Sequence, residues 1–327
     1  MRIRFRSLTA LIILAFLFYF VGTEELFSVL LKIQFQYLLY LAGIAVVLIW
    51  ISCVKWRLFI DSSGHTTSIL YLMKLYTIGY FFNNFAPGSI AGDVLRSMHL
   101  GDKLSSKRDA FISTFLERFT GLVAMALLGL LFVFAGTEVT KGLELSIILV
   151  GLLTAILSIM LFSKKALNQT FLVVEFFLTK FGFSHLGIKI QTIFRRLDEG
   201  MVFARTNWIL MAKAICLSFV YHILTVINTY CACYAIGWTS VELTGLFIVV
   251  PLVLIVSMAP ITPGGLGIQE GAFLFLLQRI GATNAQGLAV GLLLRAKLFV
   301  VAIVGSLLWA SIRTKVEVKN YSLKTES

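Results

Sequence analysis

Charged side chains are scarce in this sequence of 327 residues, because Asp, Glu, Lys and Arg together make up only 13% of it. A soluble globular protein carries about 25%. Hydrophobic residues reach 59% and the mean hydropathy is +0.93, so an ordinary soluble domain is excluded. The apolar runs are long and show only weak alternation, which argues against a transmembrane β-barrel. We predict an all-α polytopic membrane protein.

Cysteine and histidine are also rare, with four of each. The cysteines lie in apolar segments, and Cys231 and Cys233 stand too close together to form a zinc pair without histidine partners. The histidines, at positions 65, 99, 185 and 222, show no metal-ligand spacing. We therefore expect no metal site and no cofactor, and we interpret the cysteines as small apolar residues.

The usual catalytic motifs are missing as well. The sequence contains no H-x-x-x-H motif, no G-x-S-x-G motif and no aspartate-rich run of the type that binds magnesium diphosphate. Such nucleophile, base or metal groups are what an enzyme acting on a lipid head group needs. No P-loop is present, so the chain does not hydrolyse ATP in that way. We expect no catalytic residue and no enzymatic activity.

What the sequence does contain is a series of apolar segments, each close to the roughly 20 residues that cross a hydrocarbon core. Two of them, Ser68–Phe85 and Leu243–Ala259, end in breaks that contain proline and glycine. The basic, apolar N-terminus resembles a signal peptide, but no small-x-small cleavage site follows, so we expect a retained helix. The uninterrupted segments are Ser7–Gly22, Phe35–Val54, Ser113–Ala135, Leu145–Phe162, Trp208–Ile236 and Gly287–Ile312.

Basic residues orient these segments, because the formal net charge is +12 and positive charge concentrates in cytoplasmic loops. The N-terminal sequence MRIRFR places the N-terminus inside, and residues 313–327 form a short basic cytoplasmic tail after a single transmembrane domain of residues 1–312. Lys55 and Arg57 precede the first interrupted segment, and Lys107 follows it. That segment must therefore enter and leave from the inside, or cross twice with very short helices, and the second segment enters and leaves from the outside.

The region 164–207 is long for a loop and has a pattern of its own. Apolar residues recur at helical spacing from Ile190 to Met201, with Arg195 and Glu199 among the charged residues opposite them. This pattern predicts an amphipathic helix on the cytoplasmic surface of the membrane. We interpret it as an interfacial connector, and a lipid-regulatory role is the alternative.

All four prolines of the chain lie at or before the two breaks. The first break reads PGSIAGD from Pro87, and the second reads PGGLGIQE from Pro263. Because the two segments enter from opposite sides, the pattern is typical of an inverted repeat whose discontinuous helices meet near the midplane. The residues that we assign to the breaks are Asn84, Pro87, Gly88, Gly92, Pro263, Gly264, Gly265 and Gly267.

We therefore predict about six full transmembrane helices and two re-entrant helical hairpins. Glycine permits the turn and lets another group approach the backbone closely. Each helix that starts after a break offers free N–H groups and a partial positive charge, which suit an anion such as phosphate. The alternative is a pair of kinked helices packed against their neighbours, in which Asp93 and Glu270 only stabilise helix N-termini.

Several ionisable residues fall at membrane depth, where a charge is costly and marks a functional site by default. Arg295, for example, lies roughly 12 Å into the last span at 1.5 Å per residue, and Lys297 is close to it on a different face. Forked arginine donors match phosphate, and carboxylates hold the arginines. Internal salt bridges that only fix helix packing are the alternative. The predicted substrate-binding residues are Asp93, Arg96, Glu117, Arg118, Glu270 and Arg295.

Three of these stretches, NNFAPGSIAGDVLR, ERFTGL and ITPGGLGIQEGA, resemble the signature blocks of a known family. This is the lysylphosphatidylglycerol synthase transmembrane-region family, also called the flippase-like domain or UPF0104 family. The resemblance covers nearly the whole chain, about residues 5 to 312. The family often has Gly-Gly-Asp where this chain has Ala91-Gly92-Asp93, a departure that leaves Asp93 in place.

The resemblance implies a stand-alone domain that moves, or helps to move, a lipid across the bacterial inner membrane. In the synthase this domain is fused to an aminoacyl-transferase, and the short stretch after Ile312 leaves no room for one, so we do not carry synthase activity over. We expect membrane lipids, anionic and phosphate-bearing, as partners, and no nucleic acid. The alternative is a non-transporting accessory protein of a glycosyltransferase or another lipid-modifying enzyme.

Overall fold

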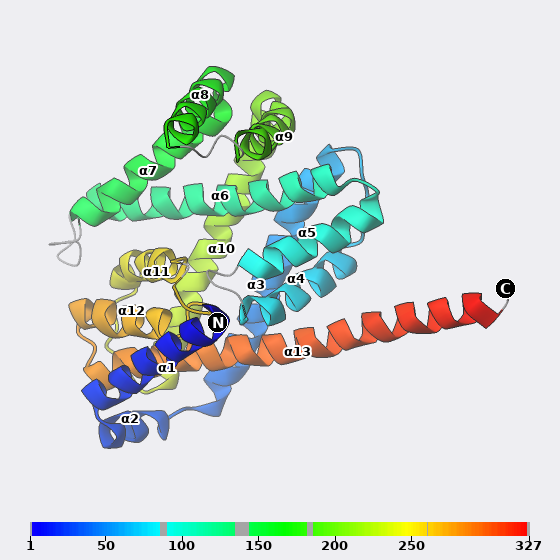
Figure 1. Cartoon of the computed structure of the whole chain (residues 1–327). Helices are drawn as coiled ribbons and strands as arrows, with labels where there is room; N and C mark the ends of the chain where they lie inside the picture. The colour runs from blue at the N-terminus through cyan, green and yellow to red at the C-terminus, as the bar shows by residue number, and fades with distance from the viewer. Residues whose placement is uncertain (1, 86–89, 135–143, 182–185, 260, 326–327) are drawn as a thin grey trace.

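The structure is a computed structural model that describes residues 2–85, 90–134, 144–181, 186–259 and 261–325. These residues form helices and connecting turns, so the prediction of an all-α membrane protein is confirmed (Figure 1). A short 3-10 helix, Gln278–Ile280, precedes the last long helix. The α-helices are α1 (Arg2–Val21), α2 (Thr23–Leu30), α3 (Phe35–Ser62), α4 (Ile69–Asn83), α5 (Ile90–Leu104), α6 (Lys107–Phe134), α7 (Glu144–Phe162), α8 (Lys164–Lys180), α9 (Gly187–Thr206), α10 (Trp208–Ala235), α11 (Leu243–Ser257), α12 (Ile268–Leu277) and α13 (Asn284–Thr325).

Four of the described helices, α3, α6, α10 and α13, are each long and apolar enough to cross a membrane. Two more spans result if each sharply bent pair counts as one: α1 turns by 89° into α2, and α7 turns by 103° into α8. All six contain segments that the sequence predicts as spans. Helix α3, however, continues from the expected end at Val54 to Ser62. Lys55 is therefore part of a helix that continues beyond the predicted end of this span.

Polar residues at the helix starts explain several of these boundaries. Ser68, Ser163 and Asn207 precede α4, α8 and α10, and each side-chain oxygen accepts a hydrogen bond from a backbone N–H of the first turn at 3.1–3.3 Å. Such caps satisfy N–H groups that have no partner within the helix. The cap at Ser163 lies at the sharp turn between α7 and α8.

Helices α3 and α10 pack against each other and run antiparallel. At one end the backbone N–H of Gln34, just before α3, donates to the carbonyl oxygen of Ala235 at the end of α10 (3.0 Å). Towards the other end of the pair, Lys55 Nζ donates to Ser218 Oγ (3.0 Å). The first broken segment, α4 and α5, follows α3, and the second, α11 and α12, follows α10. The two broken segments therefore start from opposite ends of the bundle.

The two helices of the first broken segment approach each other closely. A Cβ on Gly92 of α5 would collide with the carbonyl oxygen of Gly79 in α4, so only glycine allows this crossing. The amide oxygen of Asn83 accepts a hydrogen bond from the Gly92 N–H at 2.7 Å. Pro87 and Gly88, which we assign to this break, lie outside the described residues.

The second broken segment is turned by glycines in the left-handed region. Gly264, Gly265 and Gly267 have φ values of +56°, +69° and +83°, which glycine adopts at no steric cost. A Cβ on Gly264 would lie 3.2 Å from the carbonyl oxygen of Asn83 and 3.4 Å from the Cα of Asn84. The two broken segments thus touch each other where they turn, as expected for opposed re-entrant hairpins.

Helix α13 packs against both broken segments. Added Cβ atoms would lie 2.9 Å from the Leu274 Cα at Gly287 and 3.0 Å from the Glu270 Cα at Gly291, both in α12. Further along, a Cβ on Gly305 would collide with the carbonyl oxygen of Thr77 in α4. One helix therefore contacts the two hairpins through glycines.

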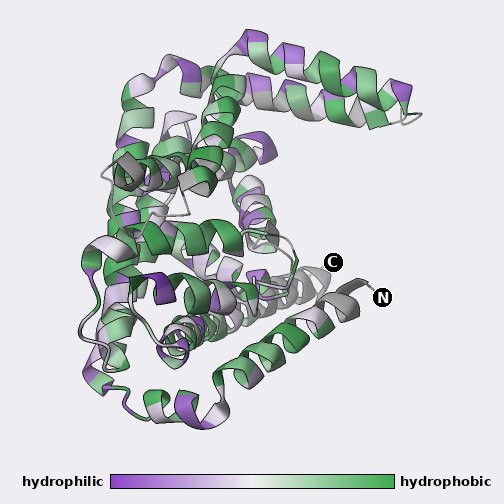
Figure 2. Cartoon of the chain, turned by 90° about the vertical axis from the view of Figure 1, so that its left-hand side faces the viewer, coloured by the Kyte–Doolittle hydropathy of each residue, from purple (hydrophilic) through white to green (hydrophobic). Residues whose placement is uncertain are grey.

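The connector at residues 164–207 forms two helices, α8 and α9, and the helix predicted from Ile190 to Met201 lies within α9. Figure 2 shows α8 and α9 side by side at the top, extending away from the rest of the bundle. Phe171 and Phe194 join them, with ring centroids 5.5 Å apart. Arg205 of α9 anchors the pair by donating to the carbonyl oxygen of Leu161 in α7 at 2.8 Å.

Candidate functional site

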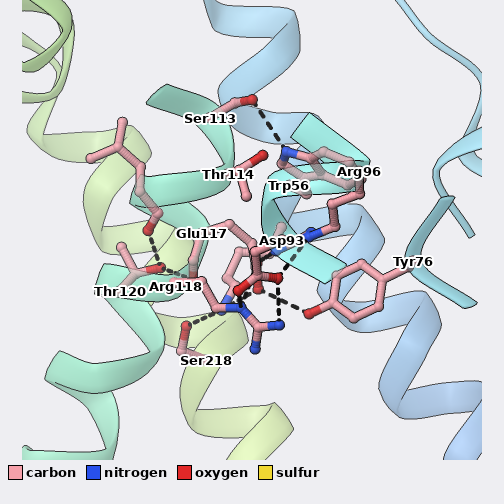
Figure 3. Close-up of polar contacts among 12 residues, drawn as sticks. Trp56, Tyr76, Asp93, Arg96, Ser113, Thr114, Glu117, Arg118, Thr120 and Ser218 are labelled. Atoms are coloured by element: carbon pink, nitrogen blue, oxygen red, sulfur yellow. Dashed lines mark hydrogen bonds and ion pairs between the residues drawn. The ribbon is translucent and has the colours of Figure 1, made fainter. Parts of the chain in front are cut away.

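Five charged side chains from three helices meet in the interior of the bundle (Figure 3). We call this group the first ion cluster. Lys55 comes from α3, Asp93 and Arg96 come from α5, and Glu117 and Arg118 come from α6. Glu117 lies ten residues after the start of α6, or roughly 15 Å along the helix at 1.5 Å per residue. The cluster therefore lies well inside a candidate membrane span.

The Glu117 carboxylate is the centre of the first ion cluster, and its side chain is only 3% exposed. Its Oε2 accepts a hydrogen bond from Arg96 Nη2 at 2.6 Å. Its Oε1 lies 3.4 Å from Lys55 Nζ and accepts a hydrogen bond from the Tyr76 hydroxyl at 3.4 Å. Lys55 in turn donates to Ser218 of α10. A buried carboxylate with two cationic partners meets the requirement that charges inside a membrane protein be paired.

The Arg96 guanidinium lies between two aromatic rings, with its Cζ 4.4 Å from the ring centroids of both Trp56 and Tyr76. Arginine over an aromatic face is stabilised by the ring quadrupole. The Trp56 Nε1–H donates to Ser113 Oγ at 3.2 Å, which fixes one of the rings. Arg96 Nε donates to Asp93 Oδ1 at 3.0 Å. The remaining nitrogen, Nη1, is buried and has no hydrogen-bond partner in the part of the chain that the structure describes.

Arg118 forms the open side of the first ion cluster. Its Nε and Nη2 donate to the two oxygens of Asp93 at 2.9 and 2.8 Å. This side chain is nevertheless 48% exposed, while those of Arg96 and Glu117 are 1% and 3% exposed. The cluster therefore has a closed end at Glu117 and an accessible end at Arg118.

The first ion cluster has an excess of positive charge. Three cations, Lys55, Arg96 and Arg118, face two carboxylates, Asp93 and Glu117. The formal sum is +1. A net positive, partly accessible group of arginines is suited to an anion with several acceptor oxygens.

A second ion cluster, Glu270 and Arg295, lies at the second break. Glu270 Oε1 accepts from Arg295 Nε at 2.5 Å, and Oε2 accepts from the Gly267 N–H at 2.7 Å. Arg295 also donates to the carbonyl oxygens of Gly264 and Gly265 at 2.8 and 3.2 Å. Both side chains are almost fully buried. This cluster is electrically neutral, and it holds the turn of the second broken segment.

The structure thus brings the six predicted residues together in two groups, and no contact described for them joins the groups. Asp93, Arg96, Glu117 and Arg118 form one, and Glu270 and Arg295 form the other. Sequence reasoning missed the participation of Lys55, Trp56, Tyr76, Ser218 and Asn83.

One sequence signal points to Lys55. It lies in the run WISCVKWRLFI, with apolar residues before it and a tryptophan after it, in phase with the predicted helix from Phe35. A lysine with apolar flanks inside a continuing helix is a candidate for a buried pair rather than a loop cation.

A cavity of about 90 Å³ lies towards the start of α6 and does not enclose the first ion cluster. It reaches Ser113, which is one helical turn before Glu117 and accepts the Trp56 hydrogen bond. Its polar lining includes Arg108, whose Nη2 donates to the Glu199 carbonyl oxygen of α9 at 3.1 Å. The full lining consists of Phe59, Ser63, Arg108, Asp109, Ile112, Ser113, Leu116 and Glu199.

Comparison with known proteins gives one family. Residues 5–305 match the family described as the lysylphosphatidylglycerol synthase TM region. A protein of Methanothermobacter thermautotrophicus described as a UPF0104 membrane protein is 25% identical over 264 residues, which cover 75% of this chain and 74% of that protein. No solved structure matches the chain. The family match includes both broken segments and both ion clusters.

Proposed function

Because this chain belongs to the lysylphosphatidylglycerol synthase TM region family, we propose that it moves an anionic, phosphate-bearing lipid across the membrane through the first ion cluster. The chain is a multi-pass membrane protein. We place its two termini on the cytoplasmic side of the cell membrane, since both carry excess basic residues. The lipid head group would meet the cluster at Arg118.

The observation that carries this proposal is the exposure of Arg118. Its side chain is 48% exposed although it lies inside a candidate membrane span. A guanidinium in contact with hydrocarbon is costly, and such residues face a water-filled cavity or a polar partner. The accessible end of the first ion cluster is therefore a place where a charged head group is stabilised.

The charge and hydrogen-bonding capacity of the cluster favour an anion. The formal charge of +1 is not balanced by a described carboxylate, and Arg96 Nη1 has no hydrogen-bond partner among the described residues. A buried donor without an acceptor carries the cost of its desolvation. A phosphate oxygen near the arginines would lower that cost. An uncharged or cationic head group would leave the excess positive charge unbalanced.

We propose a different role for the second ion cluster. Arg295 uses its donors on Glu270 and on the carbonyl oxygens of Gly264 and Gly265. Backbone groups at membrane depth need such partners, because no water satisfies them there. We therefore propose that Glu270 and Arg295 position the second break, so that they shape the site without binding the phosphate.

The opposed hairpins suggest how a lipid would move. They start from opposite ends of the bundle and touch where Gly264 meets Asn83. In transporters with inverted repeats, one repeat rocks against the other around a central site. The first ion cluster includes Asp93 at the start of α5, so a shift of the first hairpin would change the access to Arg118.

Lipid translocation in proteoliposomes tests this proposal. The purified full chain is reconstituted with a reporter-labelled phosphatidylglycerol, and the loss of the inner-leaflet pool to a membrane-impermeant quencher is followed. The test variant is Arg118→Gln, which removes the accessible guanidinium. The matched control is Arg57→Gln, which removes a half-exposed arginine of α3 whose ion pair within the described part of the chain is with Asp61.

Wild-type protein and the Arg57→Gln control are expected to translocate the lipid above the rate of empty liposomes, and Arg118→Gln is expected to be at least tenfold slower. Equal rates for Arg118→Gln and wild type would place the site elsewhere. No translocation of several lipid classes by well-folded wild-type protein would contradict the transporter and favour an accessory role beside a lipid-modifying enzyme.

A further inference from the structure

Lys297 is an intramembrane cation that belongs to neither of the two ion clusters. Its Nζ donates to Asn228 Oδ1 at 3.0 Å. It follows Arg295 by two residues in α13, and the two side chains contact different elements, since Arg295 binds the second break and Lys297 binds α10. Among the described residues, no carboxylate pairs with Lys297. A cation at membrane depth without a carboxylate is costly unless a ligand completes it.

Lys297, which donates one hydrogen bond to Asn228, can donate to a further acceptor. Asn228 is 3% exposed, so its amide is fixed within the bundle. The Lys297 residue is only partly buried. An ammonium has three N–H donors, and Asn228 takes one of them. The other donors remain for an anionic group.

Helix α10 connects this pair with the first ion cluster. Ser218 accepts from Lys55, and Asn228 lies ten residues later in the same helix, or roughly 15 Å further along. Between them, His222 Nε2 lies 3.0 Å from the carbonyl oxygen of Gly121, and its buried Nδ1 has no partner in the described part of the chain. Buried polar side chains thus follow α10 from one cation site to the other.

We propose that Lys297 and Asn228 form a second binding station for the phosphate group of an anionic lipid, towards the opposite end of α10 from the first ion cluster. This inference rests on the proposed function, because it supplies a second place for the same head group. The two stations together carry two uncompensated positive charges, one at each. A head group leaving one cluster then has a second cation within reach.

Native mass spectrometry of the full chain tests the second station by counting retained lipids. Phosphatidylglycerol is the probe, and phosphatidylcholine of the same acyl length is the comparison without net charge. The variants are Lys297→Met, Arg118→Gln and the double variant. Lys297→Arg keeps the charge, and Lys213→Met makes the same substitution at an exposed lysine of α10.

We expect wild type, Lys297→Arg and Lys213→Met to retain two molecules of phosphatidylglycerol. Each of Lys297→Met and Arg118→Gln should retain one, and the double variant none. Retention of two by Lys297→Met, or of only one by wild type, would overturn the second station. Size-exclusion chromatography of each variant shows whether it is folded, and recovery in Lys297→Arg ties the loss to the charge.

Two further comparisons separate the possible explanations. An excess of inorganic phosphate that leaves the lipid bound to Lys297 identifies the lipid head group as the ligand, whereas displacement identifies the free anion. The lipid count also does not depend on transport. If wild type retains two lipids and Lys297→Met one, but wild type translocates none, the station stands and the transporter fails. If wild type translocates the lipid while Lys297→Met still retains two lipids, the transporter stands and the second station fails.

Discussion

Two parallel hydrogen bonds join Arg118 of α6 to Asp93 of α5, from Nε to Oδ2 at 2.9 Å and from Nη2 to Oδ1 at 2.8 Å. Arg96 shares the same carboxylate at 3.0 Å. Asp93 therefore holds two guanidinium groups together that would otherwise repel each other. It also competes with any anion for their donors, so it sets both the geometry and the affinity of the site.

Neutralising Asp93 should separate binding from transport. In Asp93→Asn, the two arginines lose a competing carboxylate, so an anionic lipid should bind about tenfold more tightly, which corresponds to about 1.4 kcal/mol. Its release, and hence its translocation, should slow by a similar factor. Lipid titration and the proteoliposome assay measure the two effects. Asp102→Asn, at an exposed position of the same helix, should change neither. Weaker binding in Asp93→Asn would contradict the competition.

The buried pair of Lys55 and Glu117 should be a major stabilising contact. Removing Glu117 leaves Lys55 without a carboxylate among the described residues, and breaking a buried ion pair in this way costs about 3–5 kcal/mol. We expect Glu117→Gln to lower the thermal unfolding midpoint in detergent strongly, and Lys55→Met to lower it less, because Glu117 keeps its contact with Arg96. The double variant should lose less than the sum of the two, because no charge of the pair then stays unpaired. Additive losses would show that the two side chains, 3.4 Å apart, are not coupled.

The crossing of α4 and α5 should not tolerate a methyl group. In Gly92→Ala, the new Cβ would collide with the carbonyl oxygen of Gly79 and lie 2.7 Å from Asn83 Oδ1. Overpacking of this kind costs about 1–3 kcal/mol, and here it also displaces the helix that carries Asp93 and Arg96. Thermal unfolding and the translocation assay should both be affected. Gly43→Ala, at an open position of α3, should leave both unchanged, and an equal effect there would contradict the packing argument.

Removing Arg295 should loosen the second break without emptying the lipid site. In Arg295→Met, the carbonyl oxygens of Gly264 and Gly265 lose their donors. Hydrogen exchange of the backbone between residues 261 and 269 should become at least tenfold faster, while the number of retained lipids stays at two. Arg279→Met, at an exposed arginine beyond α12, serves as the control. Loss of a lipid with unchanged exchange would show that Arg295 binds the head group directly.

The helices were predictable from the sequence because their apolar segments are long enough to cross a membrane, whereas some of their ends were not. Lys55 and Arg57 mark a loop by composition alone. In the fold, Lys55 is neutralised by Glu117 from α6, so α3 continues to Ser62. No local pattern reveals a partner that lies about sixty residues away in the chain. In the connector, the periodic apolar residues from Ile190 to Met201 correctly predicted a helix, which lies within α9, whereas α8 was not predicted.

The candidate site was predictable where its residues are neighbours in sequence. Asp93 and Arg96 are three residues apart and share a helix face, and their salt bridge is present. The division of the charges into two clusters was not predictable, because it depends on which break each arginine faces. Arg295 has its partners at Gly264 and Gly265, about thirty residues earlier. The aromatic rings around Arg96 come from α3 and α4, and only tertiary structure brings them there.

The glycine contacts of α13 have a mechanical consequence. Gly291 contacts α12 and Gly305 contacts α4, and the thirteen residues between them belong to one uninterrupted helix, so the two contacts lie roughly 21 Å apart along it. A helix of that length is stiff, and its two close contacts, at Gly291 and Gly305, leave no space for either hairpin to move independently of it. If one hairpin slides along α13, the other must follow it or α13 must bend. The movements of the two hairpins are therefore coupled through α13 as well as through their direct contact.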